Sequence, residues 1–180
     1  MLHYHAAGRA VAGAVVRLTG PAPSDATTDA LGRFTFADVA SAVWLLVPSK
    51  TGGENGALTA LDAAYVLQAV RNKRTLSPTQ LLAADVSGDG ILTDLDAILI
   101  LQRSVGAGSQ FPVAQACGSD WLFMPTPAPV PNQELLAPQI ASGTCQPGGV
   151  RYSPLATAAT AQDFDGVLFG DVTGNWQNGG

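Results

Sequence analysis

The sequence predicts a chain of mixed α and β structure: a small N-terminal β-sandwich, a central all-α pair of loop–helix repeats, and an irregular C-terminal β segment. Three observations lead to this prediction. Short apolar runs without a helical period fill the first 49 residues, two similar helical segments follow, and a loop-rich region with proline comes last. We therefore expect boundaries at residues 1–49, 50–106 and 107–180.

The N-terminal region contains apolar runs of strand length. We expect strands at residues 11–18 (VAGAVVRL), at residues 33–36 (RFTF), and at residues 42–47 (AVWLLV), the last of which stops at Pro48. Asp29 and Gly32 suit a tight turn before the second strand. The phrases GRAVAGAVVRLTG, TTDALGRFTFADV and AVWLLVPS resemble the carboxypeptidase-regulatory-like and collagen-adhesin B-type β-sandwich modules. This resemblance implies an extracellular spacer that has no catalytic residues of its own.

The central region contains three predicted helices, at residues 59–71, 77–84 and 93–104. Thr59 and Thr93 each precede an aspartate by three residues, as in a capping box. Ser77 is followed by proline at the first helical position and glutamine at the third. The third helix is apolar on every side over residues 97–101, so it must be covered, and we expect that the rest of the chain covers it. The alternative is that a partner chain covers it.

The two longer helices belong to an internal repeat. Residues 55–68 (NGALTALDAAYVLQ) align with residues 89–102 (DGILTDLDAILILQ) at an offset of 34 residues. So many identical pairs in so short a window indicate two copies of one structural unit. A change in one copy can therefore be judged against the other.

The second copy has the spacing of a calcium loop. Calcium is a hard cation that takes six to eight oxygen ligands, and such a loop supplies them from alternate positions and from a carboxylate at position 12. Gly90 stands at position 6, where the chain must turn sharply. The predicted ligands, at positions 1, 3, 5, 7 (by its carbonyl), 9 and 12, are Asp85, Ser87, Asp89, Ile91, Thr93 and Asp96. The alternative is a turn rich in Gly and Asp that precedes a capped helix and binds no ion.

The motif DVSGDGILTDLDA, with aspartate at position 12 and a related half 34 residues earlier, resembles the type I dockerins over about residues 50–106. The resemblance implies two calcium loop–helix halves that need Ca²⁺ for folding and that dock onto a cohesin domain in extracellular assemblies. Loop positions 10 and 11 of dockerins contact the partner. Here these are Ala60 and Leu61 in the first half and Asp94 and Leu95 in the second, and they depart from the usual Ser or Thr.

The first copy departs from the calcium pattern. Thr51 and Gly53 stand where the second copy has Asp85 and Ser87. We therefore expect a weak or empty first site. Its remaining oxygen donors are Asn55, the carbonyl of Ala57, Thr59 and Asp62.

The C-terminal region holds two further features. Residues 171–175 (DVTGN) echo residues 85–89 (DVSGD), which suggests a third calcium site, completed by Asp163 or Asp165. The more ordinary alternative is an Asx turn without an ion. Cys117 and Cys145 lack metal-type spacing and suit a disulfide in an oxidising compartment, the alternative being two unpaired buried thiols.

Composition limits the function classes. The formal net charge is −5, which argues against nucleic acid as a partner, and no apolar stretch is long enough to span a membrane. The first residues do not resemble a signal peptide, and residues 2–5 look like a strand entered midway, so we expect a fragment of a larger protein. No catalytic motif stands out.

These features together predict a non-catalytic module of a secreted or cell-surface protein that binds Ca²⁺ and docks onto a cohesin-type partner. Two alternatives remain open at this point. The repeats could act as a calcium-rigidified spacer that packs on its own β domains, or the chain could be an accessory region of a secreted hydrolase.

Overall fold

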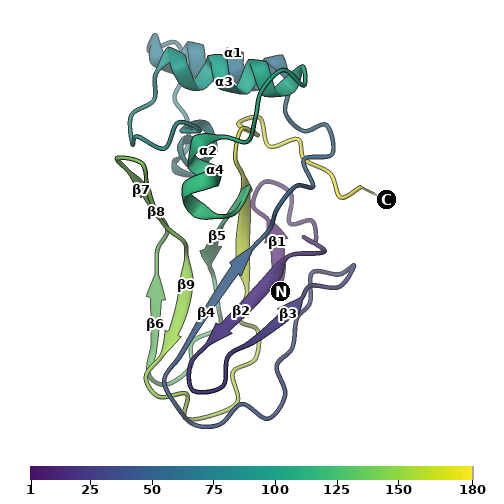
Figure 1. Cartoon of the computed structure of the whole chain (residues 1–180), viewed down its shortest axis with the longest axis vertical. Helices are drawn as coiled ribbons and strands as arrows, with labels where there is room; N and C mark the ends of the chain where they lie inside the picture. The colour runs from purple at the N-terminus through teal and green to yellow at the C-terminus, as the bar shows by residue number, and fades with distance from the viewer. Residues whose placement is uncertain (180) are drawn as a thin grey trace.

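The structure is a computed structural model in which residues 1–179 are described. Strands from both ends of the chain form two sheets, and the helices gather at one end of them (Figure 1). The three-stranded sheet has the spatial order β1 (Leu2–Tyr4), β10 (Phe164–Leu168) and β5 (Trp121–Pro125). The five-stranded sheet has the order β3 (Ser24–Thr27), β2 (Val15–Thr19), β4 (Trp44–Ser49), β9 (Gly149–Tyr152) and β6 (Gln133–Leu136).

This topology corrects the prediction of a separate sandwich over residues 1–49. β1 pairs in parallel with β10, and β4 pairs antiparallel with β9, so the N-terminal strands share both sheets with strands from the C-terminal region. The predicted C-terminal segment, over residues 107–179, is thus not a separate irregular unit. The reason is physical: three or four short strands cannot cover both faces of a core, and the C-terminal strands supply the rest.

The individual strands follow their apolar pattern. In β2, Val16 and Leu18 are buried while their neighbours are exposed, and β4 alternates in the same way. β4 continues through Pro48, which lies opposite Val16, so the expectation that the strand stops at this proline was wrong. Residues 33–36 form no strand. Phe34 and Phe36 instead lie in a loop, where their rings pack edge to face with centroids 6.2 Å apart.

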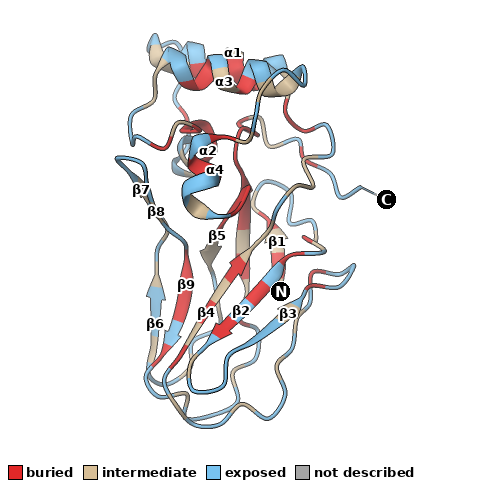
Figure 2. Ribbon diagram, viewed as in Figure 1, coloured by how far each residue is buried: buried red, intermediate tan, exposed pale blue. Residues whose placement is uncertain are grey.

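The helical region is inserted between β4 and β5. It contains α1 (Ala60–Val70), α2 (Pro78–Ala84) and α3 (Asp94–Ser104), which confirms the three predicted helices and their capping boxes. The short helix α4 (Pro112–Cys117), which the sequence analysis missed, follows them. α1 and α3 pack on each other, with their buried and exposed residues on opposite sides (Figure 2).

A two-stranded hairpin leaves the sandwich toward the helices. It consists of β7 (Gln139–Ala141) and β8 (Thr144–Gln146). The predicted disulfide between Cys117 and Cys145 is present and joins the end of α4 to β8. A single buried core runs through both sheets and the inner sides of the helices, so the insertion and the sandwich pack as one body.

Candidate metal-binding and docking site

The loop between α2 and α3 is organised by the carboxylate of Asp85. Its Oδ1 accepts the backbone N–H of Gly88 at 2.9 Å and the hydroxyl of Ser87 at 3.2 Å, and its Oδ2 accepts the N–H of Gly90 at 2.9 Å. Gly88 and Gly90 have positive φ angles of 76° and 85°, which a side chain would strain. The first six residues therefore curl around one carboxylate.

Asp96 closes the same loop from the first turn of α3. It is fully buried, and its Oδ1 accepts the N–H of Ser87 at 2.9 Å. Its Oδ2 accepts the N–H of Thr93 at 2.9 Å and the Thr93 hydroxyl at 3.2 Å. Predicted loop positions 1, 3, 9 and 12 are thus brought together by the backbone and by the helix cap.

Asp89 and Ile91 lie at the rim of the loop. Both are exposed, and Oδ1 of Asp89 accepts the N–H of Ile91 at 2.8 Å. In residues 1–179, no group of three or more His, Cys, Asp and Glu side chains is arranged to hold a metal ion. The donors around the loop are a mixture of carboxylate, hydroxyl and carbonyl oxygens. Such an all-oxygen set suits Ca²⁺ and offers nothing to softer metals.

The electrostatics of the loop favour a cation. Burial, together with the nearby charge of Asp96, raises the pKa of the Asp85 carboxyl above its usual range, and the N–H groups of Gly88 and Gly90 oppose this shift. Among the described residues, neither Asp85 nor Asp96 forms an ion pair. Buried carboxylates without a positive partner are costly, and a bound cation would remove that cost.

The β7–β8 hairpin touches this loop from outside. At its turn, the N–H of Gly143 donates to the carbonyl of Gly88 at 2.8 Å, and the N–H of Ser142 donates to the carbonyl of Asp89 at 3.3 Å. The disulfide to Cys117 anchors the hairpin to α4. This contact could not be predicted from a local pattern, because residues 142 and 143 lie more than 50 positions after the residues that they contact, Gly88 and Asp89.

The first repeat has part of the hydrogen-bond arrangement seen in the loop at residues 85–96. Asp62 is fully buried at the start of α1, and its Oδ2 accepts the N–H and hydroxyl of Thr59 at 2.8 and 2.7 Å. Ala57 is buried, whereas the side-chain amide of Asn55 turns away and donates to the carbonyl of Gln177 at 3.0 Å. The structure thus brings two of the four predicted donors together by their side chains.

The echo at residues 171–175 lies beside Asp62 and not beside the two acids expected to complete it. Asp163 instead pairs with the amino group of Met1 at 2.6 Å, and Asp165 lies within β10 opposite Met124. The expectation that Asp163 or Asp165 completes a site there was wrong. The internal repeat was the signal that could have predicted this pairing. Residues 57–62 lack the first half of a loop, and residues 171–175 lack the second half.

The predicted partner-contact positions are all exposed: Ala60, Leu61, Asp94 and Leu95. Asp94 forms a surface ion pair with Arg71 at 3.1 Å. The solvent-facing side of α1 and α3 carries further apolar side chains, and we refer to it as the outer helix surface. Its members are Leu61, Leu67, Leu95, Ile98 and Leu101, which are between 36% and 53% exposed. The expectation that the chain covers its third helix on every side was therefore wrong.

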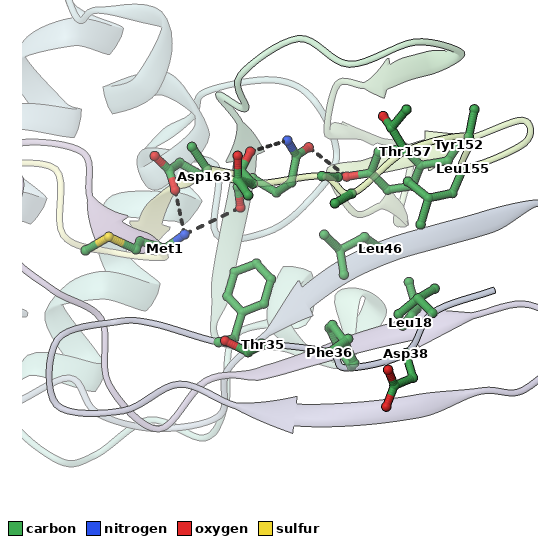
Figure 3. Close-up of a pocket in the computed structure, with 18 of the residues that line it drawn as sticks. Met1, Leu18, Thr35, Phe36, Asp38, Leu46, Tyr152, Leu155, Thr157 and Asp163 are labelled. Atoms are coloured by element: carbon green, nitrogen blue, oxygen red, sulfur yellow. Dashed lines mark hydrogen bonds and ion pairs between the residues drawn. The ribbon is translucent and has the colours of Figure 1, made fainter. Parts of the chain in front are cut away.

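A pocket of about 940 Å³ lies elsewhere, in the sandwich (Figure 3). Leu18, Leu46 and Tyr152 line it from the five-stranded sheet, and the loops at residues 33–41 and 155–163 complete it. Its lining is mainly apolar and includes no residue of the helical region. It is thus separate from both the loop and the outer helix surface.

Comparison with known proteins identifies the helical insertion. No curated protein and no solved structure matches the chain. None of the helices in the described residues is long and apolar enough to cross a membrane. Residues 54–104 match the family model of the dockerin type I domain. The chain therefore contains a dockerin type I module, a non-catalytic unit of protein–protein docking, inserted into its β-sandwich.

Proposed function

We propose that the dockerin module binds Ca²⁺ in the loop at residues 85–96 and docks, through the outer helix surface, onto a cohesin-type domain outside the cell. Asp85 and Asp96 would hold the ion from inside the loop. Ser87, Asp89, Thr93 and the carbonyl of Ile91 would complete the oxygen set. The bound ion would offset the repulsion between the carboxylates and so fix the start of α3.

The observation that carries the docking proposal is the exposure of Leu61 and Leu95. They occupy the same position in the two repeats and are 53% and 51% exposed, and Leu95 lies one turn before the exposed Ile98 on α3. Neighbouring exposed apolar side chains are a feature of protein interaction sites. The Cys117–Cys145 disulfide supports an oxidising, extracellular location.

A binding measurement tests this proposal. Immobilised type I cohesin domains would be exposed to the protein in millimolar Ca²⁺ and in chelator. We expect binding in Ca²⁺ only. Ile98→Lys should weaken it at least tenfold, because a charge would be desolvated at the contact. Leu31→Lys is the matched control, since Leu31 is 53% exposed in a sandwich turn and should leave binding unchanged.

The second candidate function is a calcium-rigidified spacer. The contacts of the β7–β8 hairpin with Gly88 and Asp89 favour it, because they tie the loop to the sandwich and not to a partner. A protein that is stabilised by Ca²⁺ but binds no cohesin of a broad panel would support the spacer. Absence of Ca²⁺ binding would overturn both functions.

A further inference from the structure

The chain returns to the dockerin module after its last strand. Beyond β10, the N–H of Gly170 donates to the carbonyl of Ala83 at 2.8 Å. The side-chain amide of Gln80 then donates to the carbonyl of Val172 at 2.9 Å. Residues 170–172 therefore lie against α2, next to the start of the first repeat (Figure 1).

The carboxylate of Asp171 organises this segment as Asp85 organises its loop. Oδ1 of Asp171 accepts the hydroxyl of Thr173 at 3.3 Å and the N–H of Gly174 at 2.9 Å, and Oδ2 accepts the N–H of Trp176 at 2.9 Å. Asp85 has the same partners at its positions 3, 4 and 6. Residues 171–176 thus have the hydrogen-bond pattern of the first half of the second-repeat loop.

The second half is supplied by the first repeat. The N–H of Thr173 donates to Oδ1 of Asp62 at 2.7 Å, just as the N–H of Ser87 donates to Oδ1 of Asp96 at 2.9 Å. Asp62 and Asp96 occupy the same repeat position, and both accept from the threonine three residues before them. The two halves meet without a covalent link between positions 6 and 7.

The sequence supports this match independently of the geometry. Residues 171–175 read DVTGN and residues 85–89 read DVSGD. The hydroxyl at position 3 is therefore kept, and the carboxylate at position 5 becomes a carboxamide. Trp176 stands where Gly90 has a φ of 85°. Glycine is not needed there, because the chain does not have to turn back into the next half.

Buried charge is a second, separate observation. Asp62 is 0% and Asp171 1% exposed, and neither forms an ion pair among the residues described. Their hydrogen bonds come only from neutral donors, including the hydroxyl of Tyr4 at 2.5 Å on Asp171. Two buried carboxylates next to one another are costly without an ion-pair partner, and a bound cation would remove that cost.

We propose that residues 171–175 and the first repeat form a second calcium site, split between distant parts of the chain. Asp171, Thr173 and Asn175 take positions 1, 3 and 5. The carbonyl of Ala57, Thr59 and Asp62 take positions 7, 9 and 12. The site rests on the proposed interpretation of residues 85–96 as a calcium loop, which serves as its template. It replaces the weak first site that Asn55 would have joined.

The split site should bind more weakly than the intact loop. It has two carboxylates, whereas the loop at residues 85–96 has three, and calcium affinity rises with the number of charged ligands. Asn175 is exposed at position 5, where the intact loop has Asp89. Asn175→Asp should therefore tighten the split site, by about tenfold in Kd, without disturbing buried structure.

The test is a calorimetric Ca²⁺ titration of the full chain. The wild type should bind two ions. Asp96→Asn and Asp171→Asn should each leave one, and the double variant none. Asp165→Asn, which makes the same charge change within β10, is the control and should leave two. Near-ultraviolet circular dichroism checks that each variant is folded.

Terbium luminescence distinguishes the two sites directly. Trp176 and Tyr4 adjoin Asp171, whereas residues 85–96 contain no tryptophan or tyrosine. Tb³⁺ emission excited through the indole should survive in Asp96→Asn and vanish in Asp171→Asn.

Each failure has a distinct pattern. One Ca²⁺ that Asp96→Asn abolishes and Asp171→Asn leaves would overturn the split site and keep the proposed function. One Ca²⁺ with the reverse pattern would keep the split site and overturn the loop at residues 85–96. An Asn175→Asp variant with unchanged or weaker Ca²⁺ affinity would also overturn the split site, even if Asp171→Asn failed to fold.

Discussion

The backbone N–H of Thr173 donates to Oδ1 of Asp62 at 2.7 Å, across 111 residues of sequence. The equivalent bond in the second repeat joins Ser87 to Asp96, nine residues apart. One hydrogen-bond pattern is therefore made locally in one half of the dockerin module and over a long range in the other. The long-range version ties the N-terminal half of the module to the segment that follows the last strand.

Removal of calcium should lower the thermal stability of the whole chain. An ion that binds only the folded state stabilises it by about 2.7 kcal/mol when present at a hundred times its Kd, which corresponds to roughly 5 to 10 °C in Tm for each site. Differential scanning calorimetry with Ca²⁺ and with chelator measures the effect. Because the module and the sandwich share one core, we expect a single transition that moves as a unit.

Magnesium is the control for this prediction, because it demands a smaller octahedral site and should give a much smaller shift. Identical melting with Ca²⁺ and with chelator would contradict the prediction. A transition that splits in chelator would show instead that the module unfolds separately from the sandwich.

The helical module could be predicted from the sequence because its signals are local. Ser77 with Pro78 and Gln80, and Thr93 with Asp96, place the helix starts within a few residues. The ligand order around Gly90 is also contained in one short segment. The structure therefore agrees with the predicted helices almost residue by residue.

The sandwich could not be predicted in the same way. β4 was recognisable as an apolar run, but its partner β9 lies about 100 residues later and carries no complementary pattern. Strand pairing depends on which surfaces remain unburied after the chain folds, and a local apolar run does not contain that information. The loop at residues 33–36 shows the converse, since its alternation of polar and aromatic residues serves packing outside any sheet.

The candidate site likewise has a local part that could be predicted from the sequence and a long-range part that could not. The ligands proposed for the loop at residues 85–96 all lie in one short segment, whereas the partner of the echo at residues 171–175 lies far away in the sequence and was not predicted. Asp163 and Asp165 are close in sequence, but the direction of β10 carries the chain away from them to Asp62. Only the fold could bring the two half-loops together.

Loss of the disulfide should destabilise the protein and loosen the intact loop. Replacement of Cys117 and Cys145 by serine frees a closed loop of 28 residues, which costs about 3.5 kcal/mol in the chain-entropy treatment. The hairpin would then hold Gly88 less firmly, so Ca²⁺ affinity at residues 85–96 should fall several-fold. Urea unfolding and calorimetry measure the two effects.

The split site is the internal control for the disulfide variant, because the hairpin contacts the loop at residues 85–96 through Gly88 and Asp89. Terbium emission excited through tryptophan should therefore be unchanged. An unaltered Ca²⁺ affinity at the intact loop would mean that the hairpin contact is incidental.

Ionisation of Tyr152 should weaken the fold at alkaline pH. Its hydroxyl is buried and donates to Oε1 of Gln162 at 2.7 Å, and burial raises its pKa to about 12 from an ordinary value near 10. The folded state thus favours the neutral form. This contribution is complete below pH of about 10 and is lost as the pH rises toward 12, up to about 2 to 3 kcal/mol.

Tyr152→Phe separates the contribution of Tyr152 ionisation to stability from that of other groups that titrate in the same pH range. The variant should lose about 1 kcal/mol at neutral pH with the hydrogen bond. Its unfolding free energy, measured by denaturant titration at several alkaline pH values, should then decline less steeply than that of the wild type. Parallel curves above pH of about 10 would show that Tyr152 does not ionise on unfolding.

Trp176 should be the residue that holds the last segment on the module. Its ring packs against Tyr4 and Trp121, with centroids 5.2 and 4.9 Å away, and its Nε1 donates to the carbonyl of Gly53 at 2.6 Å. Trp176→Phe keeps most of the packing and should cost about 1 kcal/mol for the hydrogen bond. Trp176→Ala also leaves a cavity and should cost about 4 kcal/mol.

In millimolar Ca²⁺, the alanine variant should in addition lose the weaker calcium site, because Asp171 would no longer be held beside Asp62, while the phenylalanine variant keeps it. Equal stability of the two variants would mean that the ring contributes little, and that other contacts position this segment.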